Sequence, residues 1–340
     1  MSSTSQGSPG IVSGVVPGEL SRDGENMKKL RFGVMADDVR TTAELVTLAR
    51  WAEQAGFSTL LLRDHVVPEP FGDQLGPLTA MTVAAMATTS LRIGSLVIAN
   101  DFRPPVQLAR EIATIDQLSG GRVELGLGAG FLRAEYAPLG ITFDSPGVRV
   151  SRLAEAIRLL RQLFSGDPVS FHGAYYQVEN YTSFPIPPQR ENLPLLVAGY
   201  GDRMLSLAAR EADIVGLQTV TTTTGTVVAD PENWLAETVL RKVDLLARVA
   251  GNRFDHLELN STITMHPCPD REAGAREIIA QRGWEAISSA QVLGMPAFLI
   301  GANDEIIAQI RHRHATYGLS YLVVSQAQAP LLAPLISALR

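Results

Sequence analysis

The chain has 340 residues, of which 46% are hydrophobic and 19% charged, and its formal net charge at pH 7 is -6. This composition supplies a large core, so it excludes a disordered chain and a small scaffold held together by cross-links. An acidic balance with no block of lysines and arginines argues against nucleic acid and anionic membranes as partners.

Segments typical of strands and helices alternate from residue 30 onward. Short apolar runs predict strands at residues 30–35, 59–62, 91–98, 123–127, 195–198, 213–217, 257–266, 297–300 and 321–324. Apolar residues at helical spacing predict helices at residues 42–55, 78–88, 105–118, 149–164, 203–211, 231–251, 270–281, 304–317 and 330–339. About eight strand–helix units favour an α/β fold, a (β/α)8 TIM-type barrel with insertions; a doubly wound sheet is the alternative.

Three stretches depart from this alternation. Residues 169–188 contain a hairpin pattern and then a Pro-rich loop, and the Thr-rich loop 219–230 is either a lid or a mobile segment. Residues 1–26 are rich in Ser and Gly and have no apolar core typical of a signal peptide, so we expect a disordered extension. We expect residues 27–340 to form a single domain. No apolar run approaches the roughly 20 residues that span a membrane.

The chain offers few residues for a disulfide or a metal site. Cys268 is the single cysteine, which excludes an intramolecular disulfide and a cysteine-built zinc site and is consistent with a reducing cytoplasm. His312 and His314 are two residues apart on a predicted helix, so they face different directions. We therefore predict a cytoplasmic protein without a bound metal.

An ionisable pair, Asp64 and His65, follows the second predicted strand. In a barrel, functional side chains lie where the strands end and the following loops begin. A histidine there can move a proton or bind the edge of a ligand. The structural alternative is an Asp that caps the chain beside a packed His.

Two glycine-containing turns also follow strands. Gly199 and Gly201, separated by Tyr200, open a predicted helix whose N-terminus favours a phosphate. Gly128, Ala129 and Gly130 follow the fourth strand. Neither turn has the Lys-Ser/Thr of a phosphate-binding P-loop, and neither fits the dinucleotide fingerprint. Ordinary tight turns are the alternative.

Several short motifs together resemble those of the bacterial luciferase-like monooxygenase superfamily, most closely its branch of oxidoreductases that use the deazaflavin coenzyme F420. The resemblance extends from about residue 30 to residue 324. It rests on the order and spacing of Trp51-Ala-Glu-Gln-Ala-Gly56-Phe57, Asp64-His65, Leu91-Arg92-Ile93-Gly94, Asn100-Asp-Phe-Arg103-Pro104, Leu118-Ser-Gly-Gly-Arg122, Gly126-Leu-Gly-Ala-Gly130, Pro146-Gly-Val-Arg149 and Leu207-Ala-Ala-Arg-Glu-Ala-Asp213.

The resemblance implies a TIM-type barrel with a flavin-like cofactor across the carboxyl ends of its strands. Asp64 and His65 match the pair at the reactive edge of the ring. A bulge with a non-prolyl cis peptide behind the ring falls at about Leu96–Val97 in this chain. The remaining positions expected to bind the cofactor are Ala99, Asn100, Gly128, Ala129 and Gly130 beside the ring and ribityl chain, and Gly199, Tyr200 and Gly201 at the phosphate.

One departure bears on the substrate. Sugar-phosphate dehydrogenases of this superfamily carry a Glu proton donor just after the fourth-strand glycines, where this chain has Phe131 and then Leu132. The departure weakens the case for a sugar phosphate and indicates a less polar substrate pocket. The deazaflavin and FMN bind the same surface in this superfamily, and only the resemblance favours F420 over FMN.

The first hypothesis is therefore an oxidoreductase that moves a hydride between reduced F420 and a small organic substrate, with His65 handling a proton and Asp64 setting the polarity of the site. A second is a two-component monooxygenase that uses O₂ and reduced FMN from a separate reductase. A third is a flavin-binding protein without turnover. By analogy with the superfamily, a homodimer is also an expectation.

Overall fold

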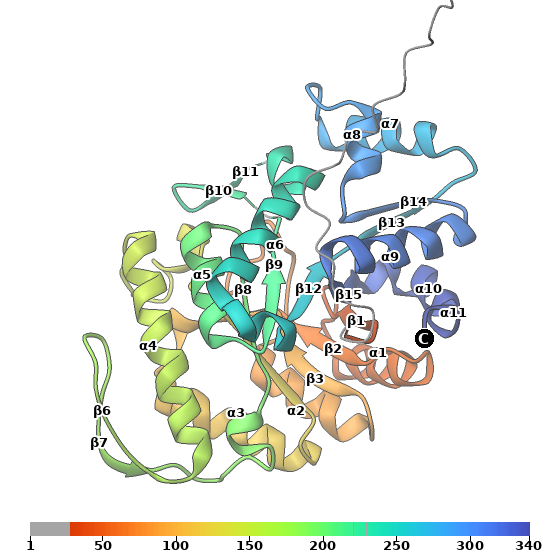
Figure 1. Ribbon diagram of the computed structural model, residues 1–340. Helices are drawn as coiled ribbons and strands as arrows, with labels where there is room; N and C mark the ends of the chain where they lie inside the picture. The colour runs from red at the N-terminus through yellow and green to blue at the C-terminus, as the bar shows by residue number, and fades with distance from the viewer. Residues whose placement is uncertain (1–27, 220, 229) are drawn as a thin grey trace, which may run out of the picture.

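In the computed structural model, which describes residues 28–340 apart from 220 and 229, the chain closes into a parallel β-barrel surrounded by helices (Figure 1). This confirms the predicted (β/α)8 barrel and excludes the doubly wound sheet. The extension predicted for residues 1–26 lies outside the described residues. The barrel strands are β1 (Arg31–Met35), β2 (Thr59–Leu62), β3 (Arg92–Ser95) with β4 (Ile98–Ala99), β5 (Val123–Gly128), β8 (Leu195–Gly199), β9 (Ile214–Leu217), β12 (Glu258–Thr262) and β15 (Leu319–Ser325).

The third barrel position is built from two short strands. β3 pairs with β5 at Ile93 and Gly94, which closes the barrel, and β4 pairs with the last two residues of β5. Between β3 and β4, the Leu96–Val97 peptide bond is cis. The interruption that the family resemblance implied therefore lies at the expected residues.

Most of the helices cover the outside of the barrel, and these bury apolar residues against it. α1, for example, begins at a capping box formed by Thr41 and Glu44 and buries Leu45, Leu48, Ala49 and Ala52. The helices are α1 (Thr42–Gln54), α2 (Pro77–Ala87), α3 (Pro105–Ser119), α4 (Pro146–Ser165), α5 (Asp202–Glu211), α6 (Ala236–Ala250), α7 (Arg271–Arg282), α8 (Ser289–Gly294), α9 (Asn303–Tyr317), α10 (Ala329–Leu332) and α11 (Ile336–Leu339).

The amino-terminal end of the barrel is closed by an ion-pair network. Arg31 donates to both oxygens of Glu258 and to Glu124, and its guanidinium lies 3.6 Å from the centre of the Tyr321 ring. Arg92 donates to the same Glu124 oxygen at 2.6 Å. Burial alone would lower the pKa of Arg31, but Glu124 and Glu258 raise it well above its ordinary value. The charges at this end are thus paired with one another.

The expected strand at residues 257–266 divides between two sheets. Ile263 N–H still donates to Val323 of the barrel, whereas Thr264 N–H donates to Ala297. The chain after β12 therefore leaves the barrel as β13 (Thr264–Pro267) and pairs with β14 (Phe298–Gly301), the segment expected as a further strand. With α7 and α8, these strands enclose a small apolar core of their own.

Two helices are shorter than the apolar spacing predicts. The final one is broken at residues 333–335, because Pro334 has no N–H to donate to the preceding turn. The helix expected from residue 231 becomes regular only at Ala236, after a 3-10 turn that Asp230 caps. No helix in the described part of the chain is long and apolar enough to cross a membrane.

The two irregular stretches inside the barrel domain, residues 169–188 and 219–230, each contain a hairpin. The predicted hairpin within residues 169–188 is present as β6 (Pro168–His172) and β7 (Gln177–Thr182). The Thr-rich stretch, expected as a loop, contains β10 (Thr221–Thr223) and β11 (Thr226–Val228). Thr224 and Gly225 between these strands have φ of 52° and 86°, the signs that a two-residue type I′ turn requires.

Candidate active site

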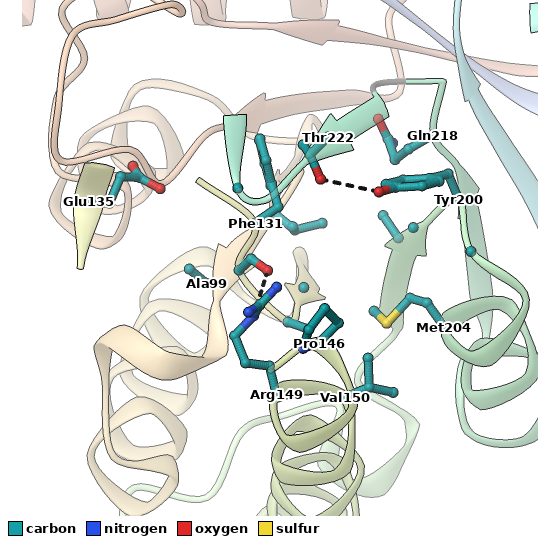
Figure 2. A pocket seen from close by; sticks show the side chains of 18 of the residues that line it. Ala99, Phe131, Glu135, Pro146, Arg149, Val150, Tyr200, Met204, Gln218 and Thr222 are labelled. Carbon is teal, nitrogen blue, oxygen red and sulfur yellow. Dashed lines mark hydrogen bonds between the residues drawn. The ribbon is translucent and has the colours of Figure 1, made fainter. Parts of the chain in front are cut away.

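A cavity of about 880 Å³ opens at the carboxyl ends of the barrel strands. It is lined by the ends of β1, β2, β4, β5, β8, β9 and β12, by the start of α4 and by the β10–β11 hairpin. Figure 2 shows Ala99 and Phe131 on one side of this space, with Tyr200 and Gln218 opposite and Arg149 and Pro146 below. This is the end at which TIM-barrel enzymes carry their active sites.

Most of the residues expected to form a site line this one cavity. They are Asp64, His65, Leu96, Val97, Ala99, Gly128, Ala129, Gly130, Gly199, Tyr200 and Gly201. Asn100 does not line it: its side chain is buried and donates to the Tyr176 hydroxyl at 3.1 Å. The chain turns into a short 3-10 helix at Asn100, which directs this amide away from the cavity. The roles of the lining residues remain predictions.

His65 is held on three sides. Its Nδ1 lies 3.0 Å from Glu135 Oε1, and its ring stacks on Phe71 at a centroid distance of 4.3 Å. The Phe131 ring lies nearly perpendicular to it, at a centroid distance of 5.8 Å. An ionised carboxylate only accepts hydrogen bonds, so Nδ1 carries the hydrogen. Nε2 has no hydrogen-bond partner among the described residues, and it is therefore the nitrogen available to a ligand.

Glu135 is the site residue that sequence reasoning missed. It belongs to a short 3-10 helix, Arg133–Glu135, that follows the glycine turn after β5, and it is only 2% exposed. The same Oε1 atom also accepts the Val66 N–H at 3.0 Å. Seventy residues separate Glu135 from His65. Glu135 could have been identified from its position four residues after Phe131, because this loop follows a barrel strand whose carboxyl end lies at the same end of the barrel as that of β2.

Asp64 has a different role from its neighbour. Both of its carboxylate oxygens are engaged: Arg103 binds them in a two-point ion pair, and the Ala99 N–H donates to Oδ2 at 3.1 Å. Asp64 is 4% exposed. These bonds tie Asp64 to Arg103 and to the backbone of β4 beside the cavity.

The two glycines of the turn after β8 differ in what surrounds them. A Cβ added to Gly199 would lie 2.3 Å from Met204 Cγ, whereas one added to Gly201 would meet nothing within 4 Å. Packing against α5 thus explains why residue 199 has no side chain, but it does not explain the glycine at residue 201. Gly201 caps α5 and lines the cavity, so the open space beside it is suited to an anion at the helix N-terminus.

Three arginines gather around residues 143–147, at the start of α4. Arg133 and Arg149 lie 4.4 Å and 4.1 Å from the centre of the Phe143 ring, and Arg203 approaches Gly147 and donates to Ser151. All three line the cavity, and among the described residues none of them pairs with a carboxylate. Burial lowers the pKa of Arg149. Asp144 and Asp202 also line this half but pair with Arg152 and Arg241, so this half of the cavity carries an excess of positive charge.

The β10–β11 hairpin covers the cavity and is fastened to both halves of its rim. The Tyr200 hydroxyl and Thr222 Oγ1 are 3.1 Å apart (Figure 2). On the other side, the Arg133 N–H donates to the Gly225 carbonyl at 2.9 Å, and Arg133 Nε donates to the Thr224 carbonyl at 3.0 Å. Of the two alternatives for this stretch, the contacts favour a lid.

These features fit a flavin or deazaflavin. Leu96 and Val97 offer an apolar surface to a planar ring, and the arginines and the turn at Gly201 suit its phosphate. Gln218, at the end of β9, has a buried Nε2 that finds no acceptor among the described residues, which a ring or substrate oxygen can satisfy. Within the described part of the chain, no cluster of His, Cys, Asp and Glu is suited to a metal ion.

Comparisons with known proteins agree with this geometry. Residues 27–234 match the family described as luciferase-like monooxygenase. The chain is 34% identical over 183 residues to the F420-dependent hydroxymycolic acid dehydrogenase of Mycobacterium tuberculosis, covering 53% of this chain and 50% of that one. It is 34% identical over 190 residues to the F420-dependent glucose-6-phosphate dehydrogenase of Gordonia bronchialis, covering 54% and 55%. The chain thus spans about half the length of these curated relatives.

Solved structures show the same fold at low sequence identity. The coenzyme F420 dependent tetrahydromethanopterin reductase from Methanopyrus kandleri superposes with a TM-score of 0.70 at 18% identity, over 92% of this chain and all of that one. A monooxygenase from Streptomyces bottropensis superposes with a TM-score of 0.69 at 20% identity over the same shares. Both support the barrel with its insertions.

Proposed function

Because the chain belongs to the luciferase-like monooxygenase family, we propose that it is an F420-dependent oxidoreductase acting on a small organic substrate. The observation that carries the proposal is the His65–Glu135 pair, which stands at the edge of a cavity whose other half is cationic. The F420-dependent activities named for the matching relatives support the choice of cofactor.

Different residues of this chain would bind the ring and the phosphate of the cofactor. Leu96, Val97 and Ala99 would lie against the ring, while Gly201 and Arg203 would receive the phosphate. Bound F420 supplies the chemistry of accepting or donating a hydride at a carbon atom of the substrate. The hairpin would exclude water from the ring, because it closes the space between Tyr200 and Arg133.

His65 would handle the accompanying proton. Glu135 holds Nδ1–H, so neutral His65 presents the lone pair of Nε2 to the cavity and can accept the hydroxyl proton of an alcohol. When an alcohol is oxidised, its carbon loses a hydride, its oxygen loses this proton and a carbonyl forms. In the opposite direction, protonated His65 returns the proton to the carbonyl oxygen.

The experiment is a fluorescence titration of the purified protein with F420 and with FMN, each oxidised and reduced. The proposal expects F420 to bind more tightly than FMN, and it expects hydride exchange with a substrate panel without consumption of O₂. Tighter binding of reduced FMN together with O₂ consumption would contradict it and would favour the two-component monooxygenase with its separate reductase. Cofactor binding without any turnover would favour a non-catalytic flavin protein. Homodimer formation and the cytoplasmic location remain predictions.

A further inference from the structure

The half of the cavity beside His65 is aromatic. Phe71 covers one face of the imidazole. The Phe131 ring lies nearly perpendicular to both His65 and Phe71, at centroid distances of 5.8 Å and 6.1 Å. All three rings line the cavity. A substrate that brings its oxygen to His65 Nε2 must therefore place its carbon skeleton against Phe71 and Phe131, where burial of apolar surface is favourable.

Among the residues that the structure describes, this half offers no unpaired cation to an anionic substrate. Arg63 lines it, but it pairs with Asp37 at 3.6 Å and lies 5.5 Å from the centre of the Phe71 ring. Behind His65, Glu135 adds a buried negative charge. The arginines without a carboxylate partner gather instead around residues 143–147. A phosphate beside Phe131 would lose its water without gaining a counter-charge, which is costly.

We propose that the substrate is an uncharged alcohol or ketone whose reacting carbon carries apolar groups, and that a phosphorylated sugar is excluded. This inference rests on the proposed function and makes it more specific. It also separates this chain from the matching relatives named for glucose 6-phosphate. Phe131 determines this specificity, because its ring lies beside both His65 and Phe71 and it directly follows the glycine turn at residues 128–130.

The first test compares cyclohexanol with glucose 6-phosphate on the F420-loaded protein. Calorimetry should detect binding of cyclohexanol and none of glucose 6-phosphate, and kcat/KM with oxidised F420 should favour cyclohexanol by about 100-fold or more. Preference for glucose 6-phosphate, or binding of neither compound by protein that is saturated with F420, would overturn the inference. Failure of F420 itself to bind would instead overturn the proposed function.

The second test uses Phe131→Ala, with Phe184→Ala as the matched control. Phe184 is 60% exposed and contacts Arg110, away from the cavity. Phe131→Ala should weaken cyclohexanol binding by about tenfold or more and leave F420 affinity unchanged, whereas Phe184→Ala should change neither. Phe131→Leu, which keeps an apolar side chain, guards against misfolding of the alanine variant. Phe131→Leu also loses the ring, so it should weaken cyclohexanol binding by a smaller factor than Phe131→Ala. Unchanged affinity in folded Phe131→Ala, or in Phe131→Leu if the alanine variant does not fold, would overturn the role of this residue.

Discussion

Arg31 and Arg92 at the amino-terminal end of the barrel differ from Arg133, Arg149 and Arg203 at the carboxyl end in whether a carboxylate neutralises them. At the amino-terminal end, Arg31 and Arg92 are satisfied by Glu124 and Glu258. At the carboxyl end, Arg133, Arg149 and Arg203 contact carbonyls, a hydroxyl and an aromatic ring, but no carboxylate among the described residues. Removing one partner of a neutralised pair destabilises a fold, whereas charges left without a counter-ion beside a cavity are available to a ligand. The comparison predicts that substitutions at one end change stability and those at the other change binding or turnover.

The largest effect is expected at His65. Replacement by Ala should lower turnover by roughly 10²–10⁴-fold, because a positioned general acid–base group is lost. F420 affinity and melting temperature should change little, since the phosphate contacts and the barrel remain. If folded, cofactor-saturated His65→Ala turned over at the normal rate, the proton would have to be handled elsewhere and His65 would be a packing residue.

At the other end of the barrel, Glu124→Gln should act on stability alone. Glu124 is 2% exposed and receives hydrogen bonds from both Arg31 and Arg92. Removing its charge leaves Arg31 with Glu258 and Arg92 with no carboxylate partner among the described residues, so the free energy of unfolding should fall by about 3–5 kcal/mol. Chemical denaturation measures the loss, with Glu179→Gln on the exposed β6–β7 hairpin as control. A loss of F420 affinity in folded Glu124→Gln would contradict the prediction that substitutions at the amino-terminal end change stability alone.

Glu135→Gln sharpens the comparison, since it removes a buried charge from the ligand-binding end. The amide can still accept from His65 Nδ1–H, but the charge-assisted part of the bond disappears. Such bonds contribute about 1.5–3 kcal/mol, so turnover should fall by roughly 10- to 100-fold and the pH profile should shift. A purely structural role would lower the melting temperature and leave the pH profile of folded enzyme unchanged.

The barrel was predictable because its strands are short buried runs at regular intervals, such as residues 59–62 and 195–198. The β10–β11 hairpin was not, because its turn carries Thr-Gly where Asn-Gly or Asp-Gly is the usual signal. The division of residues 257–266 between two sheets depends on which carbonyls lie beside Ile263 and Thr264, and this is a matter of tertiary pairing.

Sequence reasoning located only part of the site, because the remaining contacts also depend on tertiary pairing. Strand ends and the family resemblance located His65 and the glycine turns. The contact between His65 and Glu135 and the pairing of Arg31 with Glu124 join residues far apart in the chain. Glu124 does stand out as a charge within an otherwise apolar strand, but its partners could be known only after the strands were ordered around the barrel.

The most direct test of the central claim, that the carboxyl end binds F420 through its phosphate, is a titration of Gly201→Val. A Cβ added at Gly201 meets no protein atom within 4 Å, so we expect the variant to fold and to place its methyl groups in the anion site. Affinity should fall by about tenfold or more for F420 and stay unchanged for the phosphate-free deazaflavin chromophore. Equal losses for both compounds, or unchanged F420 affinity, would contradict the account.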